Sequence, residues 1–211
     1  MGLASLEGAD SFADLVSGLK AFAAKSGRPE GSWITGFGYD HNFLKEKAHP
    51  TKEVLDAAFA HTPVLITHAS GHMGVANSAA LAELGITADT RDPQGGNIGR
   101  VPGTQEPNGY LEETAFTGLT SQLPQPTLQQ RLEQLDAAQN LYLQNGITTV
   151  QDGRVRPDEW AILKAMAEAG RFLVDVVGYV TLADHRAIAL ENPAYRKKYR
   201  NRLKIGGYKM F

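Results

Sequence analysis

Apolar and polar residues follow two periods along this chain, and the periods separate expected helices from expected strands. Apolar side chains recur every three or four residues in segments that we predict to be amphipathic helices. These segments are 11–25, 51–61, 75–85, 128–146 and 157–170. Short runs rich in β-branched and aromatic residues predict strands. These runs are 33–40, 63–70, 147–153, 172–182 and 203–211.

From residue 127 onward the expected elements alternate as helix, strand, helix, strand, helix and strand. Such alternation is typical of parallel βα units, and it leaves a doubly wound sheet and a (β/α)8 barrel as alternatives. In the turn-rich stretch before it, Asn108-Gly109 predicts the turn of a hairpin between 98–101 and 110–113. The sequence contains neither a GxGxxG fingerprint nor a phosphate-binding P-loop.

Composition excludes several classes of function. The 211 residues carry 21 Lys and Arg against 23 Asp and Glu, so nothing in the net charge of −2 indicates a nucleic acid or membrane partner. The basic run 196–204 reads as a solvated helix face. The absence of cysteine excludes disulfides, thiolate nucleophiles and cysteine zinc sites. With no run of 18 apolar residues and no signal peptide, we expect a cytoplasmic protein.

His68 and His72 lie four residues apart in ITHASGHMG, the spacing of two zinc ligands on a helix. The preceding PVLIT is too β-branched for a helix, and Gly71 separates the two histidines, so that interpretation fails. His68 reads as a strand-end histidine hydrogen-bonded to the backbone. For His72 the flanking glycines allow close approach of another molecule, which makes it a candidate substrate contact.

Two further candidates follow expected strands. Asp152 comes after ITTVQ, where a barrel would place active-site groups, although Asp-Gly also makes an ordinary turn. Lys209 follows IGGY, and a buried amine there would act as a base or react with carbon dioxide to give a carbamate. A plain exposed strand-end lysine is the alternative. Of the neighbours Glu112 and Glu113, at most one faces a site, because adjacent strand residues point to opposite faces.

Several strings, in this order, resemble the amidohydrolase 3 family, the metal-dependent branch that includes D-aminoacylase and N-substituted formamide deformylase relatives. They are HASGHMGVANSAAL, PQGGNIGR, EPNGYLEETA, GITTVQDG and GGYKMF. The resemblance runs from about residue 10 to residue 211. It implies a distorted (β/α)8 barrel with a β-sandwich, and hydrolysis of a non-peptide C–N bond in a small amide-type substrate by a metal-activated hydroxide.

The resemblance also implies a ligand set for a divalent metal, with zinc the expected ion. The set is a His-x-His pair on the first barrel strand, a lysine carbamate or glutamate on the fourth, histidines on the fifth and sixth, and an aspartate on the eighth. By this comparison 147–152, 173–180 and 206–211 match barrel strands two, three and four, and Lys209 takes the carbamate position. SGHMGVAN resembles a wall of the substrate pocket, which makes His72 an expected substrate contact. Asp152, at the end of an expected barrel strand, is the other expected substrate contact.

The sequence departs from this pattern because it contains no His-x-His pair. We therefore expect an α/β piece of a longer protein: a partial (β/α)8 TIM-type barrel of about strands 2–4, with a large α+β insertion and without the β-sandwich. Residues 1–30 would hold the helix after an absent first strand, 31–120 the insertion lining the pocket, and 121–211 the βα units. One lysine does not hold a catalytic metal, so this chain alone is expected to bind none stably and to be inactive. The alternative is a non-catalytic binding or regulatory module, or a remnant of such an enzyme.

Overall fold

The structure is a computed structural model that describes residues 2–27, 29, 31–119, 123, 126–184 and 186–210. The chain divides into two compact units, Met1–Gln125 and Pro126–Phe211, and each is described by itself. None of the helices in the described ranges is long and apolar enough to cross a membrane.

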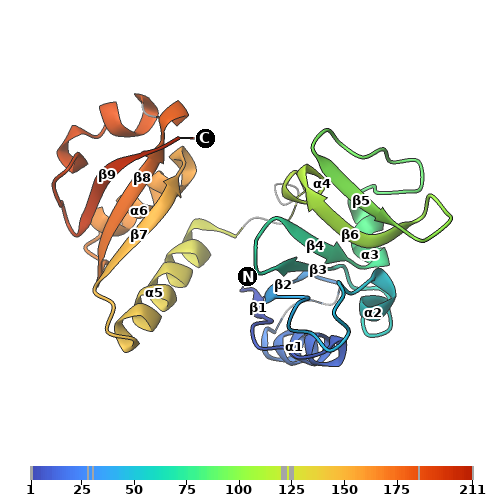
Figure 1. Cartoon of the computed structure of the whole chain (residues 1–211). Coiled ribbons are helices and arrows are strands. Elements are labelled where there is room, and N and C mark those ends of the chain that lie inside the picture. The colour runs from blue at the N-terminus through green and yellow to red at the C-terminus, as the bar shows by residue number, and fades with distance from the viewer. Residues whose placement is uncertain are drawn as a thin grey trace. The chain divides into compact units, whose positions relative to one another are not determined.

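The first unit is built on a six-stranded mixed sheet with the order β1-β2-β3-β4-β6-β5 (Figure 1). Strands β1 to β3 run parallel, and β4, β6 and β5 continue the sheet with antiparallel pairing. The strands are β1 Ala4–Ser5, β2 Ile34–Tyr39, β3 Val64–His68, β4 Met73–Ala76, β5 Gly96–Arg100 and β6 Pro107–Glu113. The strands predicted around 33–40 and 63–70 are thus confirmed as β2 and β3.

In the described part of this unit, four α-helices accompany the sheet: α1 Phe12–Lys25, α2 Lys52–Asp56, α3 Ser78–Glu83 and α4 Thr114–Thr117. The predicted helix 11–25 is confirmed as α1, with the Ser11 hydroxyl accepting the N–H of Asp14 as N-cap. Leu15 and Leu19 of α1 are fully buried in the core that also holds residues of β1 and β2. The prediction of helix from residue 75 is wrong at its start, because residues 75 and 76 belong to β4.

Asn77 joins β4 to α3 and is fully buried. Its Oδ1 accepts the N–H groups of Val64 and Ala80, each at 2.9 Å. Its Nδ2 donates to the carbonyl oxygens of Phe59 at 2.8 Å and Thr62 at 2.9 Å. One side chain therefore caps α3 and holds the segment after α2 against the start of β3.

The hairpin predicted between 98–101 and 110–113 exists as the antiparallel pair β5 and β6, but its predicted turn is wrong. Asn108 and Gly109 lie inside β6, and residues 101–106 make the connection. Gly109 has a positive φ of 99°, and a Cβ there would lie 2.5 Å from the carbonyl oxygen of Ala76. Close backbone approach, rather than turn geometry, requires this glycine.

The second unit is a three-stranded parallel sheet, β7-β8-β9, accompanied by two helices (Figure 1). The elements are α5 Leu128–Gln144, β7 Thr149–Val155, α6 Pro157–Glu168, β8 Asp175–Thr181 and β9 Leu203–Lys209. Between β8 and β9 the chain forms short 3-10 turns at Leu182–Asp184 and Pro193–Tyr195 and a π-turn at Arg186–Leu190. The predicted alternation is confirmed from α5 to β8, and the three strands are parallel as expected, but in the described residues short turns stand in place of the third expected helix.

Candidate functional site

The carboxyl ends of β2 and β3 bring together polar side chains that are distant in sequence. These strands are parallel neighbours, and Tyr39 pairs with His68 at the end of the ladder. The loop after β2 begins with Asp40 and His41 and carries His49 before α2. The strand ends and the loop together build a cluster of one carboxylate, one phenol and three imidazoles.

Asp40, His41 and His68 form the tightest group in this cluster. His41 Nδ1 lies 3.3 Å from His68 Nε2, and Asp40 Oδ1 lies 3.8 Å from the former atom and 3.5 Å from the latter. His68 is buried, while Asp40 and His41 are partly exposed. Among the residues that the structure describes, only this trio is found as three His, Asp or Glu donors close enough to share a metal ion.

The loop after β2 fixes the charge of Asp40. The backbone N–H of Asn42 donates to Asp40 Oδ1 at 2.9 Å, and this hydrogen bond is the main cause that holds the pKa of the carboxyl below its ordinary value. The Asn42 side-chain amide at 3.0 Å and the nearby His68 act in the same direction. Asp40 is therefore a carboxylate throughout the neutral range.

His49 packs beside this trio, against the rings of His41 and His68. Its ring stacks on His41 with 4.0 Å between centroids and lies 4.7 Å from the ring of Tyr110. Its Nδ1 is 3.0 Å from the hydroxyl of Tyr39, whose own pKa is raised by burial. Burial, and then the imidazoles of His41 and His68, lower the pKa of His49 to about 4, so this ring is neutral at neutral pH.

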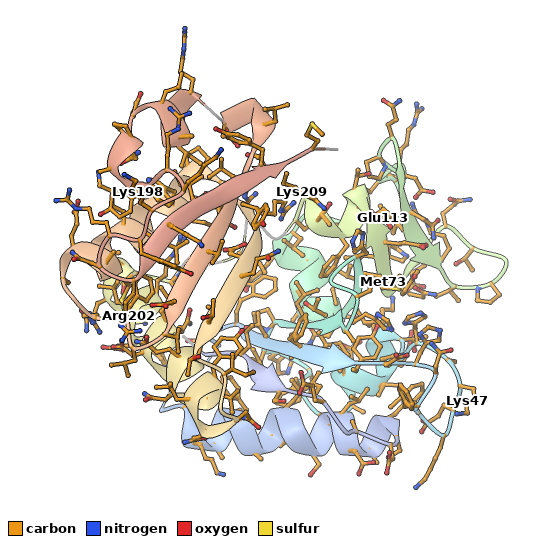
Figure 2. All side chains as sticks on the ribbon, turned by 60° about the vertical axis from the view of Figure 1, so that its left-hand side comes forward. Lys47, Met73, Glu113, Lys198, Arg202 and Lys209 are labelled. Carbon is orange, nitrogen blue, oxygen red and sulfur yellow. The ribbon has the colours of Figure 1, made fainter. Side chains whose placement is uncertain are left out.

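His72 lies in the turn that leads from β3 into β4. His68 and His72 do not share a helix, which confirms the prediction made from the β-branched residues before His68. The Nδ1 atom of His72 lies 3.1 Å from Glu113 Oε2, and both side chains are more than half exposed. Figure 2 labels Glu113 and Met73 on the neighbouring strands β6 and β4. Of the two predicted glutamates, Glu113 is thus the one that reaches His72.

Glu113 holds this position in an unusual backbone conformation. Its φ is +50° and its ψ is −123°, a region that glycine favours. The backbone N–H of Glu113 donates to the carbonyl oxygen of His72 at 2.8 Å. The chain therefore keeps a strained glutamate where a glycine would be relaxed, a feature often associated with functional positions.

In the second unit, the carboxyl ends of β7, β8 and β9 surround a hollow of about 640 Å³. Its lining includes Arg154 of β7 and Arg156 just after it, Thr181 at the end of β8 and Asp184 in the turn that follows, and Lys209 at the end of β9. The hydroxyl of Thr181 donates to the carboxylate of Asp184. Lys209 is exposed rather than buried, and Figure 2 labels it at this end of β9.

A bulge decides which face of the sheet carries Lys209. Ile205 pairs with Gly178, but Gly207 pairs with Tyr179, so Gly206 is an extra residue in β9. Beyond it Lys209 pairs with Thr181, and paired residues of parallel strands project from the same face. Lys209 therefore projects from the face opposite to buried Leu203 and Ile205, whereas strict alternation would place it with them.

Asp152 lies in the middle of β7, because this strand continues to Val155 instead of ending at the predicted Asp-Gly turn. It pairs with Gly178, and its carboxylate accepts the N–H of Arg154 at 3.0 Å. It lines two shallow hollows together with Leu135 and Leu163 of the helices. Asp152 and Lys209 are thus on opposite faces of the same sheet, and the structure does not bring them together.

The sequence interpretation missed Asp40, His41 and His49. Its signals were present: a carboxylate and a histidine directly follow one expected strand, and a histidine ends the next. Two strands that prove to be parallel neighbours put such residues at one sheet edge. His68 was expected to be satisfied by the backbone, and it does accept the N–H of Ser70 at its Nδ1. The contacts at its other nitrogen are the ones that went unrecognised.

Comparisons with known proteins agree with this architecture. A family model, that of the amidohydrolase family, matches residues 1–211. The protein LONG AFTER FAR-RED 3 of Arabidopsis thaliana is 34% identical over 158 residues, 74% of this chain and 26% of its own length. The N-substituted formamide deformylase of Arthrobacter pascens is 33% identical over 147 residues, 68% of this chain and 27% of its own length.

The fold has a solved counterpart. A crystal structure of an uncharacterised metal-dependent hydrolase from Pyrococcus horikoshii superimposes with a TM-score of 0.61 at 23% identity, covering 98% of this chain and 38% of the other. The chain belongs to the amidohydrolase family, since the match extends over all of its residues. It spans about a quarter of the length of the two relatives named above.

Proposed function

We propose that these 211 residues are part of a metal-dependent hydrolase that cleaves a non-peptide, amide-type C–N bond in a small molecule. The observation that carries the proposal is the family match over the whole chain. The Arthrobacter relative supports the bond type by its name, N-substituted formamide deformylase. The face of β9 that carries Lys209, beside a hollow at the strand ends, supports a site in the second unit.

The organisation we propose follows the resemblance described above. Strands β7, β8 and β9 would be strands two to four of a (β/α)8 barrel, whose active sites lie at the carboxyl ends of the strands. Residues 31–120 would be the insertion that lines the substrate pocket, with His72 contacting the substrate. Residues 1–30 would precede it, and 121–211 would be barrel.

Lys209, as a carbamate, is the ligand that this chain would offer to the family's metal, for which we propose zinc. Catalytic zinc sites use three protein ligands. Among the described residues that line the hollow with Lys209, Asp184 is the one carboxylate, so the lining offers two ligands at most. The residues present therefore do not make a catalytic centre by themselves. We assign no catalytic step to them, and we expect the chain alone to be inactive.

The test begins with the reading frame and the coding sequence on either side of it. The product of the extended frame is purified with zinc and bicarbonate and assayed on N-formyl and N-acyl amines. Expected results are hydrolysis and zinc bound at the hydrolase site; Lys209→Ala should abolish the hydrolysis and lower the zinc content relative to the parent. A matched control is Lys198→Ala, an exposed lysine of the same unit.

Two outcomes contradict the proposal in different ways. Hydrolysis by the 211-residue chain itself, with metal, would show that the chain is a complete enzyme. An extended product that binds amides without turnover would favour the alternative of a non-catalytic binding module. Retained activity in Lys209→Ala would contradict only the metal-ligand role that we propose for Lys209.

A further inference from the structure

We propose that Asp40, His41 and His68 bind a divalent transition-metal ion of the zinc type, entirely within residues 1–125. The three side chains come from the ends of two parallel strands and the loop between them, which the sheet holds in register. The donor set is two imidazoles and one carboxylate, which suits zinc and cobalt better than magnesium or calcium. This inference does not rest on the hydrolase function proposed above.

The distances between the donor atoms support a shared ion. Zn–N and Zn–O bonds are about 2.0–2.1 Å long, so two ligands of a tetrahedral site are about 3.4 Å apart. The three observed separations between donor atoms are 3.3, 3.5 and 3.8 Å. A tetrahedral ion fits these three atoms with only small side-chain adjustments. Because Asp40 and His41 are partly exposed, the fourth position opens to solvent.

His68 also has the partner that a metal-bound imidazole requires. A metal on Nε2 puts the ring proton on Nδ1, where a neighbouring acceptor must take it. Ser70 Oγ lies 3.0 Å from Nδ1 and can accept the hydrogen bond that Nδ1–H donates. Without metal, the backbone N–H of Ser70 donates to the same Nδ1 at 3.0 Å, which puts the proton on Nε2. Metal binding therefore switches the tautomer of His68, and the Ser70 N–H gives up this hydrogen bond.

The surroundings hold the trio in place. Asn42 donates two hydrogen bonds to Asp40 Oδ1, from its backbone N–H at 2.9 Å and from its side-chain amide at 3.0 Å. The ion on Oδ1 would take the place of the side-chain hydrogen bond, while the backbone one keeps the carboxylate in position. His49 stacks on His41 and is itself engaged with the Tyr39 hydroxyl. Its stack orients the His41 ring, so we place His49 as a positioning residue and not as a ligand.

The experiment uses the 211-residue chain, stripped with a chelator and titrated with Zn²⁺ by calorimetry and with Co²⁺ by visible absorption. We expect one ion per chain and the intense Co²⁺ spectrum of a four-coordinate site. Asp40→Asn, His41→Asn and His68→Asn should each raise the dissociation constant by more than about 100-fold, and Ser70→Ala by about 10-fold. Proton-detected ¹⁵N spectra of the imidazoles should show the His68 tautomer switch on addition of Zn²⁺.

The controls separate this site from other histidines and from the hydrolase proposal. His61→Asn, an exposed histidine of the same unit, should leave the dissociation constant within about threefold. Lys209→Ala should leave it unchanged. If His68→Asn disturbs folding because His68 is buried, Asp40→Asn remains as the test variant, since Asp40 is partly exposed. Absence of saturable binding, or binding that survives Asp40→Asn and His41→Asn together in the folded protein, overturns the proposal.

Discussion

Replacing Asn77 by alanine should strongly destabilise the first unit. The substitution leaves four backbone groups without their Asn77 partner: the buried N–H groups of Val64 and Ala80 and the partly buried carbonyl oxygens of Phe59 and Thr62. An orphaned buried group costs about 1–3 kcal/mol, and a lost N-cap about 1 kcal/mol. Because some of these groups gain water in the space left, we expect a loss of about 3–5 kcal/mol in the free energy of unfolding.

Asn77→Asp tests whether Asn77 stabilises the unit through its hydrogen bonds or through its shape, because aspartate has nearly the same shape but lacks the amide donor. Aspartate keeps the two accepted bonds but turns a carboxylate toward two carbonyl oxygens in place of the amide donor. We expect Asn77→Asp to be as destabilising as Asn77→Ala at pH 7, and to recover part of the loss at low pH, where the carboxyl group becomes protonated.

The assay is urea unfolding followed by tryptophan fluorescence in a Trp160→Phe background. The remaining Trp33 donates from Nε1 to Glu83 of α3 at 2.6 Å, so its emission reports on the helix that Asn77 caps. Asn97→Ala, an exposed asparagine on β5, is the matched control and should change stability by less than about 0.5 kcal/mol. An Asn77→Ala variant within about 1 kcal/mol of the parent would refute the reasoning.

Three further predictions concern the same unit. The pKa of His49 is lowered from 6.5 to about 4 in the folded protein, so below pH 6.5 the unfolded chain binds a proton at His49 more readily than the folded chain does. The free energy of unfolding should therefore be highest above pH 6.5 and fall by about 1–2 kcal/mol toward pH 4, after allowance for the partial exposure of the ring. Urea titrations with chelator present should show this fall, and His49→Gln should reduce it. Glu113→Gly relieves the strain of the positive φ and should raise the free energy of unfolding in urea by about 1 kcal/mol. Glu112→Gly, at the adjacent residue, should lower the free energy of unfolding. Gly74→Ala places a Cβ 2.4 Å from both the Ile66 carbonyl oxygen and the Phe116 ring; we expect a loss above about 3 kcal/mol, and a normal melt would contradict it.

Local signals sufficed for most elements of this fold. Helix α5 begins at a capping box formed by Thr127 and Gln130, and its predicted C-terminal glycine, Gly146, has a positive φ of 74°. Strand β8 begins at Asp175, whose carboxylate forms an ion pair with Arg202 at the amino-terminal end of the strand. Caps and periodicity are properties of neighbouring residues, so the sequence alone reveals them.

The hairpin shows where local signals mislead. Asn-Gly is the strongest short-range turn signal, yet the Asn108 side chain accepts the N–H of Tyr110 at 3.0 Å inside a strand. The glycine is required by the backbone of β4, a strand more than thirty residues earlier in the sequence. Tertiary contact of this kind leaves no trace in the residues beside the turn.

The two candidate sites illustrate the same limit at the level of chemistry. Asp40 and His68 are separated by 28 positions, and only the parallel pairing of β2 with β3 puts their side chains within reach of one ion. Lys209 was identified from its sequence context, but the face it projects from depends on one extra residue, Gly206, whose Cβ would lie 2.4 Å from Val177. Residue types that carry chemistry are visible in a sequence. Which of them meet depends on strand order and register, and a single bulge reverses the face on which a side chain projects.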